Sequence, residues 1–281
     1  MNILDLSKLP VPDVIETLDF ETEFAERMQL FRDAMGDQYT AAFESDPVVE
    51  QIQLFTYEVL NLRARINAAA RAVLLASSAG ADLDGVLALL DAKRLDDELD
   101  DAFKARGRLA PYGYSTAGPL KAYEYHALSA HEDVRSVRVD RPTPGVVRVT
   151  VLSRVGDGVP ADDVLAAVRA ALNAEDVRPL NDTVLVEGAF VIPWALHARL
   201  HFPSGAAYEP VMLAAQADAE AYALAQHAVN TPIRSSKLIA ALGLSGVADV
   251  ELMTPADDIP AQLQGAPHCT GIVLEPVVDY E

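Results

Sequence analysis

The sequence predicts an α+β protein in which a long-helix bundle segment precedes two small α+β units with mostly antiparallel strands. Three observations lead to this prediction. A heptad pattern of apolar residues runs through the first third of the chain, and valine-rich alternating runs begin at residue 134. Between them lies "YGYSTAGPLKAYEYHALSA", a stretch rich in tyrosine and small residues. We therefore divide the chain into a helical region (1–111) and two α+β units (112–190 and 191–281).

The charge of the chain narrows the classes of partner. Its 281 residues include 22 Lys and Arg against 42 Asp and Glu, a formal net charge of −20. Nucleic acids and anionic membranes are bound mainly through Lys and Arg, so neither is expected as a partner. The N-terminal residues lack a signal-peptide pattern, no window is apolar enough to span a membrane, and Cys269 is the only cysteine. These features predict a soluble protein made in the cytosol.

The first predicted helix covers residues 18–35. Its apolar residues follow one another at intervals of four and seven positions, which places them on one helical face: Phe20, Phe24, Phe31 and Met35. The second predicted helix gives the strongest signal in the chain. Asp46 is a suitable N-cap, Pro47 fits the first helical position and Gly80 marks the end. Between them, apolar residues repeat at steps of four and three over more than three heptads: Val48, Ile52, Phe55, Val59, Leu62, Ile66, Ala69 and Val73.

A helix of this kind, about 32 residues or ~48 Å long, is longer than a compact domain needs. It could pack within its own chain against the 18–35 helix and a short helix at 82–91, or its seam could meet helices of other chains. Further leucines at 54, 60, 74 and 75 widen the apolar surface and favour a multi-chain bundle. The predicted bundle interface consists of Val48, Ile52, Phe55, Val59, Leu62, Ile66 and Val73.

From residue 134 the pattern changes to strands and short helices. Strands at 134–140 and 146–154 flank "RPTPG", a turn typical of a hairpin. The other predicted elements are a helix at 160–174 with acids in its first turn, two strands within 182–203, helices at 208–229 and 234–243, and strands at 247–255 and 269–278.

The stretch between the two patterns contains the residue types of a catalytic triad, Ser115, Glu124 and His126. The serine lacks a G-x-S-x-G elbow, and on a helix Glu124 would point away from His126. We interpret the stretch as a helix start that joins two structural units: Ser115 or Thr116 caps the helix, Gly118 bends the chain and Pro119 fixes the first turn. The predicted joint consists of Gly113, Tyr114, Ser115, Thr116, Gly118 and Pro119.

Other candidate sites have the wrong spacing. His197 and His201 are spaced like zinc ligands on a helix, but the residues around them alternate as in a strand, which would separate the imidazoles by ~13 Å. The acidic segment at 82–85 lacks the later ligands of a calcium loop, and the acidic run at 96–101 is more typical of a solvated face. "GDG" at 156–158 matches no phosphate loop. Cys269 precedes an apolar strand, as a small packed residue would. The sequence predicts no catalytic, cofactor or metal site, and therefore a protein that is not an enzyme.

Several long blocks resemble the baseplate J-like proteins of contractile-tailed phages and related particles. They are "LPVPDVIETLDFETEFAERM", the block at 44–84 that holds the heptad pattern, "GYSTAGPLKAYEYHALSA", the block at 149–186 and "APHCTGIVL". The blocks follow the order found in the family. The linker "DAKRLDDELDDAF" at 91–103 is shorter than in many members, which leaves open how the N-terminal helices are oriented.

This resemblance implies a structural role in a baseplate wedge, without a cofactor. Two copies are expected to associate with one copy of a different wedge subunit, and six such triplexes to ring a central spike hub. The N-terminal helices would join a three-chain core bundle, and the C-terminal α+β part would contact neighbouring wedges. The wedge would also bind the sheath-initiator subunit, so that rearrangement of the ring triggers sheath contraction. The particle would be a phage or tailocin, assembled in the bacterial cytoplasm.

Two other functions stay open on the sequence. A tail-associated hydrolase would use Ser115 or His126 in a pocket with a perturbed partner. A self-contained cytosolic homo-oligomer would use the heptad seam only for its own dimer.

Overall fold

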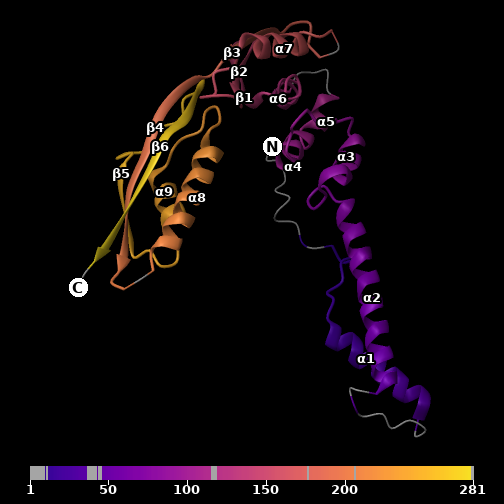
Figure 1. Ribbon diagram of the computed structural model, residues 1–281. Coiled ribbons are helices and arrows are strands. Elements are labelled where there is room, and N and C mark those ends of the chain that lie inside the picture. Colours follow the sequence, from indigo (N-terminus) through magenta and orange to yellow (C-terminus); the bar gives the residue numbers. More distant parts are fainter. Residues whose placement is uncertain are drawn as a thin grey trace. The chain divides into compact units, whose positions relative to one another are not determined.

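The computed structural model describes residues 10, 12–36, 43, 46–114, 119–175, 177–205 and 207–279. The chain forms two compact units, Met1–Arg94 and Leu95–Glu281. Figure 1 shows helices in the described part of the first unit, and helices together with strands in the second. The elements confirm the predicted α+β class with a helical N-terminal segment.

Two helices form most of the first unit. α1 (Phe20–Met35) begins two residues later than predicted because Asp19 caps it: the Asp19 carboxylate accepts hydrogen bonds from the N–H of Thr22 at 2.8 Å and from its hydroxyl at 2.7 Å. α2 (Pro47–Ala72) begins where the sequence predicts, and the Asp46 carboxylate accepts from the N–H of Val48 at 3.0 Å. The two helices pack against each other.

The long helix ends earlier than predicted, after 26 residues. In the turn that follows Ala72, the hydroxyl of Ser77 donates to the carbonyl of Arg71 at 2.8 Å and satisfies one of the carbonyls that a helix end leaves free. Gly80 then begins α3 (Gly80–Ala88) with φ +53°, a left-handed conformation that favours glycine. The prediction that Gly80 ends the long helix was therefore wrong, because this glycine starts the next one.

Three short helices open the second unit: α4 (Asp100–Gly107), α5 (Ala110–Gly113) and α6 (Leu120–Leu128). The units divide at residues 94 and 95, so the contacts of α4 and α5 place them with the strands that follow. The Arg106 guanidinium donates two hydrogen bonds to the Glu98 carboxylate, at 2.6 and 2.9 Å, and these side chains are only 5% and 4% exposed. One member of the acidic 96–101 run is therefore buried and paired.

The first sheet has the strand order β1-β2-β3. β1 (Val134–Thr143) and β2 (Val146–Ser153) form the predicted antiparallel hairpin, with Gly145 at φ +80° in its turn. α7 (Asp162–Leu172) then carries the chain back, so β3 (Thr183–Gly188) pairs with β2 in parallel. The inward valines of the sheet pack with residues of α6 and α7 in one core: Tyr123, Ala127, Val147, Val149, Val151, Val164, Val168, Leu172 and Val186.

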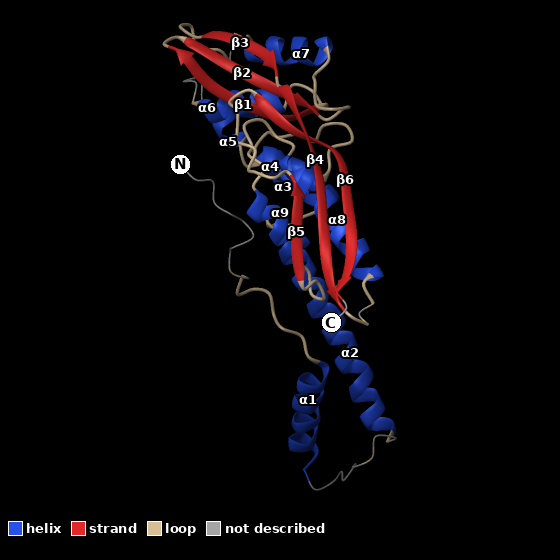
Figure 2. Ribbon diagram, turned by 90° about the vertical axis from the view of Figure 1, so that its left-hand side faces the viewer, coloured by secondary structure: helices blue, strands red, loops and turns tan. Residues whose placement is uncertain are grey.

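The second sheet has the order β5-β4-β6. β4 (Phe190–Pro203) lies between β5 (Asp249–Thr254), to which it is antiparallel, and β6 (Gly265–Asp279), to which it is parallel. α8 (Glu209–Gln226) and α9 (Ser235–Leu242) cover one face of this sheet (Figures 1 and 2). Alternate residues of β4 point into the core beneath these helices: Trp194, Leu196, Ala198, Leu200 and Phe202.

The expectation of mostly antiparallel strands was wrong in one respect, because each sheet combines one antiparallel and one parallel pair. The reason is topological. α7 connects β2 to β3, and a long segment with two helices connects β4 to β6, so the chain crosses over before the parallel partner forms. Side-chain alternation identifies a strand but carries no information on the direction of its partner.

The two sheets of the second unit are tied together by apolar and polar contacts. Leu152 and Ala189 pack against Val229 and Ala266 in a small buried cluster. On β1, the Arg135 guanidinium donates to the carbonyls of Leu224, in the last turn of α8, and of His227, its C-cap, at 2.6 and 2.8 Å. The Leu224 carbonyl also accepts from the N–H of His227 at 3.3 Å, so the arginine adds a second donor at this helix end and acts as a C-terminal cap from another element. Across the described residues, none of the helices combines the length and apolarity that a membrane span requires.

Candidate protein–protein interface

The buried face of α2 is not its most apolar face. Within the chain, α2 buries Val49, Thr56 and Asn67, which are 5%, 0% and 5% exposed. These positions follow the spacing of the predicted seam but lie one residue further along the chain. α1 and the segment before it therefore cover a face that includes two polar side chains.

Polar contacts hold this face in place. The Asn67 side chain accepts from the N–H of Glu16 at 3.1 Å and donates to its carbonyl at 2.9 Å. Arg63 of α2 pairs with Glu23 of α1, which also pairs with Arg27 at 2.8 Å. A side-chain amide that satisfies both backbone polar groups of one residue fixes the position of that segment against α2, because any shift along the helix would break both hydrogen bonds.

The predicted seam is left largely uncovered. Phe55, Leu62, Ile66 and Val73 are 59%, 61%, 52% and 71% exposed, while Val48, Ile52 and Val59 are half-buried. Leu54 and Tyr57, at 67% and 60% exposed, extend the apolar surface to one side. Val73 lies at the C-cap, just beyond the helix that was expected to contain it. The surface formed by Phe55, Leu62, Ile66 and Val73 is called the exposed seam below. An apolar strip along a helix marks a protein interaction site in soluble proteins.

The predicted joint lies partly within the described structure. Gly113 ends α5, and a Cβ at this position would come within 2.6 Å of the Tyr125 ring, so any larger residue requires the ring to shift. Tyr114 is 62% exposed, and Pro119 is the N-cap of α6, one position before the first turn in which it was expected. The joint residues Ser115, Thr116 and Gly118 lie outside the described residues, as does the serine of the hydrolase alternative.

The described members of the triad alternative do not come together. Glu124 pairs with Lys121 at 2.8 Å, one turn earlier on α6. His126 packs against the ring of Tyr125, with ring centroids 5.5 Å apart. These contacts are those of a helix surface and do not align an acid with a base.

His197 and His201 lie on β4, as the alternation predicts, and point to the sheet face opposite the helices. The Nε2 atom of His197 is 3.0 Å from Glu275, and that of His201 is 3.8 Å from Glu251. Arg199 lies between them and bonds to both glutamates, at 3.2 and 3.5 Å. This cross-strand row of charges is a structural feature of the sheet. In the part of the chain that is described, no three His, Cys, Asp or Glu side chains gather as metal ligands.

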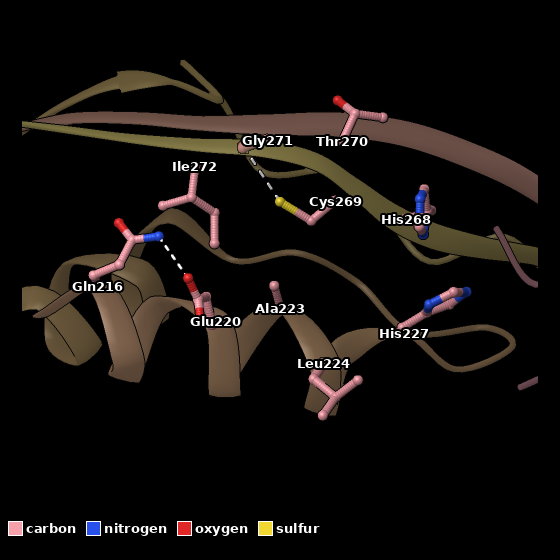
Figure 3. Close-up of a pocket in the computed structure, with 10 residues that line it drawn as sticks. All are labelled: Gln216, Glu220, Ala223, Leu224, His227, His268, Cys269, Thr270, Gly271 and Ile272. Carbon is pink, nitrogen blue, oxygen red and sulfur yellow. Dashed lines mark hydrogen bonds between the residues drawn. The ribbon is translucent and has the colours of Figure 1, made fainter. Parts of the chain in front are cut away.

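One pocket of about 330 Å³ lies between α8 and β6 (Figure 3). His227 and His268 meet at one end with ring centroids 5.0 Å apart, and the Cys269 thiol donates to the carbonyl of Gly271 at 3.4 Å. Burial, Arg135 and His268 keep the pKa of His227 below its usual range. The thiol is bonded to backbone and no base lies against it in Figure 3, so the pocket lacks a paired nucleophile.

Sequence reasoning missed the polar face of α2 and the buried Glu98–Arg106 pair. The first had a signal: a second row at steps of four and three, offset by one residue from the apolar seam, contains Val49, Gln53, Thr56, Leu60, Arg63 and Asn67. The second had none, because a glutamate inside an acidic run is normally a solvated residue.

Comparison with known proteins identifies the family. Models of the baseplate J-like family match at residues 44–96 (N-terminal domain), 115–188 (central domain) and 194–275 (C-terminal domain). The baseplate protein J of Escherichia phage P2 is 40% identical over 291 residues, with 96% of each chain covered. A chain in a cryo-EM structure of the anti-feeding prophage baseplate is 16% identical with a TM-score of 0.44, over 61% of this chain and 42% of that one. The chain belongs to the baseplate J-like family and is a component of a tail baseplate.

Proposed function

We propose that the protein is a non-enzymatic wedge subunit, two copies of which bind one copy of a different wedge subunit through the exposed seam of α2. The observation that carries the proposal is the contrast on one helix: the chain covers Thr56 and Asn67 and leaves Phe55, Leu62 and Ile66 more than half exposed. Covering the exposed part of each such side chain would contribute about 1–2 kcal/mol. A bundle with helices of other chains would cover them all, and the full predicted interface adds Val48, Ile52, Val59 and Val73.

The remaining parts would connect this triplex to the rest of the particle. The α+β units, 112–190 and 191–281, would contact neighbouring wedges in a six-fold ring around the central spike hub, and the wedge would bind the sheath-initiator subunit. The acidic charge of −20 argues against nucleic acid or membrane as partners. The joint of Gly113, Tyr114, Ser115, Thr116, Gly118 and Pro119 would absorb the difference in angle that identical subunits need in unlike positions.

The mass of the complex tests the proposal. The protein is purified alone and after co-expression with the tail protein encoded next to it, and absolute mass is measured by light scattering. We expect a stable 2:1 complex, and an aggregated or monomeric chain when the partner is absent. A homodimer that does not bind the second protein would contradict the proposal and favour the self-contained oligomer.

A matched pair of variants locates the interface. Leu62→Ser removes one exposed apolar side chain from the seam, whereas Leu180→Ser does the same on a loop of the second unit, where the leucine is 99% exposed. We expect Leu62→Ser to weaken the 2:1 complex about tenfold or more, and Leu180→Ser to leave it unchanged. Equal behaviour of the two variants would exclude the exposed seam as the binding surface. Hydrolytic activity lost in Ser115→Ala/His126→Ala, with assembly intact, would support the hydrolase.

A further inference from the structure

α8 is apolar on two opposite sides, and only one of them is buried against other described residues. Its inner side packs on the second sheet through Ala215 and Ala219, which are 0% and 1% exposed, with Val211, Met212 and Tyr222 beside them. Figures 1 and 2 both show α8 lying along the strands of the second sheet. The outer side is expected to be polar in a helix that only covers a sheet.

The outer side is instead an apolar strip. At about 100° per residue, six outward residues and Pro210 fall within an arc of roughly 120° that lies opposite the buried side. The six are Leu213, Ala214, Ala217, Ala221, Leu224 and Ala225, all exposed. The two leucines are 75% and 60% exposed, and they stand three turns apart, ~16 Å along the axis. The alanines between them leave the helix backbone open to close approach.

Acidic residues border this strip on both sides. By the same angular spacing, Asp218 lies along one side of the strip, and Glu209 and Glu220 lie along the other. α8 contains no Lys or Arg. The Glu220 carboxylate accepts one hydrogen bond from Gln216 at 2.7 Å, which leaves its charge uncompensated. An apolar strip between two acidic borders is complementary to a helix whose apolar face is bordered by Lys or Arg.

The pocket of Figure 3 opens along one border of the strip. Its α8 wall includes Glu220 and Leu224, and its β6 wall includes Ile272 and Cys269. The volume of about 330 Å³ is large enough for one bulky apolar side chain, and Ala223 leaves room at its floor. A partner helix lying on the strip could therefore place one anchor residue between α8 and β6.

We propose that the outer strip of α8 binds a basic amphipathic helix of another protein. The apolar face of that helix would lie over the alanines between Leu213 and Leu224, and its Lys or Arg residues would meet Asp218 and Glu220. A second copy of α8 does not fit, because pairing two such strips brings acidic borders together in chains that already carry a charge of −20. The inference is independent of the α2 interface, and either one can fail alone.

The test uses two labelled peptides of 18 residues that form amphipathic helices with the same leucine face, one with lysines on its polar face and one with glutamates. Binding to the full chain is measured by fluorescence anisotropy. We expect the lysine peptide to bind and the glutamate peptide not to bind. Leu213→Ser/Leu224→Ser, which leaves the charge unchanged, should weaken binding by about tenfold or more, while Leu180→Ser should not. Circular dichroism checks that the variants keep their helices.

Charge variants and the mass of the protein in solution complete the test. Asp218→Asn/Glu220→Gln should weaken binding several-fold and reduce its dependence on salt. Equal affinity of the lysine peptide for the serine variant and for Leu180→Ser would mean diffuse attraction to an acidic protein, and would overturn the proposal. Self-association that disappears in Leu213→Ser/Leu224→Ser would assign the strip to a second copy, which also overturns it.

Discussion

The buried Glu98–Arg106 pair allows a quantitative prediction about the second unit. Arg106 donates two hydrogen bonds to Glu98 and a third to the hydroxyl of Ser129 at 3.2 Å, and its guanidinium lies 5.1 Å from the centroid of the Phe103 ring. In Arg106→Met the side chain keeps its length but Glu98, only 4% exposed, loses its cation. Leaving a buried charge unpaired costs about 3–5 kcal/mol. We expect the free energy of unfolding to fall by that amount.

The only tryptophan provides the assay. Trp194 is 6% exposed on β4 of the same unit, so its fluorescence during urea unfolding reports on this unit and not on α1 and α2. Arg234→Met serves as the matched control, because its pair with Asp258 at 2.8 Å has side chains 55% and 39% exposed and should contribute less than about 1 kcal/mol. The double variant Glu98→Leu/Arg106→Met should recover most of the loss, since it leaves no buried charge. A loss below about 1 kcal/mol in Arg106→Met, or a double variant as unstable as the single one, would refute the reasoning.

Three further predictions concern the contacts around α5 and α8. Gly113→Ala places a methyl group within 2.6 Å of the Tyr125 ring and should cost about 1–3 kcal/mol by the same urea assay, since the ring must shift. Arg135→Met removes two hydrogen bonds of 2.6 and 2.8 Å at the end of α8 and should cost about 1.5–3 kcal/mol, more than the loss in Arg234→Met. The lowered pKa of His227, caused by burial and by Arg135 and His268, means that the folded state favours the neutral imidazole. The contribution of His227 to the free energy of unfolding is therefore complete above the pKa of the unfolded chain, about 6.5, and is lost as the pH falls below that value. The stability of the wild type relative to His227→Gln should consequently decrease between about pH 7.5 and 5.5.

Local signals in the sequence predicted most elements of the fold. Asp46 followed by Pro47 identified the start of α2 because a cap and a fixed φ act within one turn. The hairpin of β1 and β2 was predicted for the same reason, since its turn and its alternating valines are adjacent in the chain. Gly80 shows the limit of such signals: a glycine with positive φ can end one helix or begin the next, and the hydrogen bond from Ser77 to Arg71 decides between them.

Long-range pairings could not be predicted in the same way. β4 and β6 are parallel neighbours although α8, α9 and β5 lie between them in the chain. No residue pattern in either strand records that order. Glu98 was expected in solvent as part of an acidic run, and only the fold brings it to Arg106, whose guanidinium also donates to Ser129. The joint stays a prediction, because Gly113 and Pro119 are described but the residues between them are described only in part.

Two rows of residues on α2, offset by one position, have different surroundings: the row with Thr56 and Asn67 is buried, and the row with Phe55 and Leu62 is exposed. If the apolar seam were the core of the first unit, α1 would cover Phe55 and Leu62 and leave Asn67 in water. The structure has the reverse arrangement, and Asn67 fixes the segment before α1 with two hydrogen bonds to the backbone of Glu16. A buried polar residue specifies register at the expense of hydrophobic stabilisation. The chain thus uses polar contacts to position its own helices and leaves the apolar side chains of Phe55, Leu62 and Ile66 more than half exposed. We therefore expect the first unit alone to aggregate through this strip, and under the proposed function its solubility would depend on the wedge subunit that covers the exposed seam.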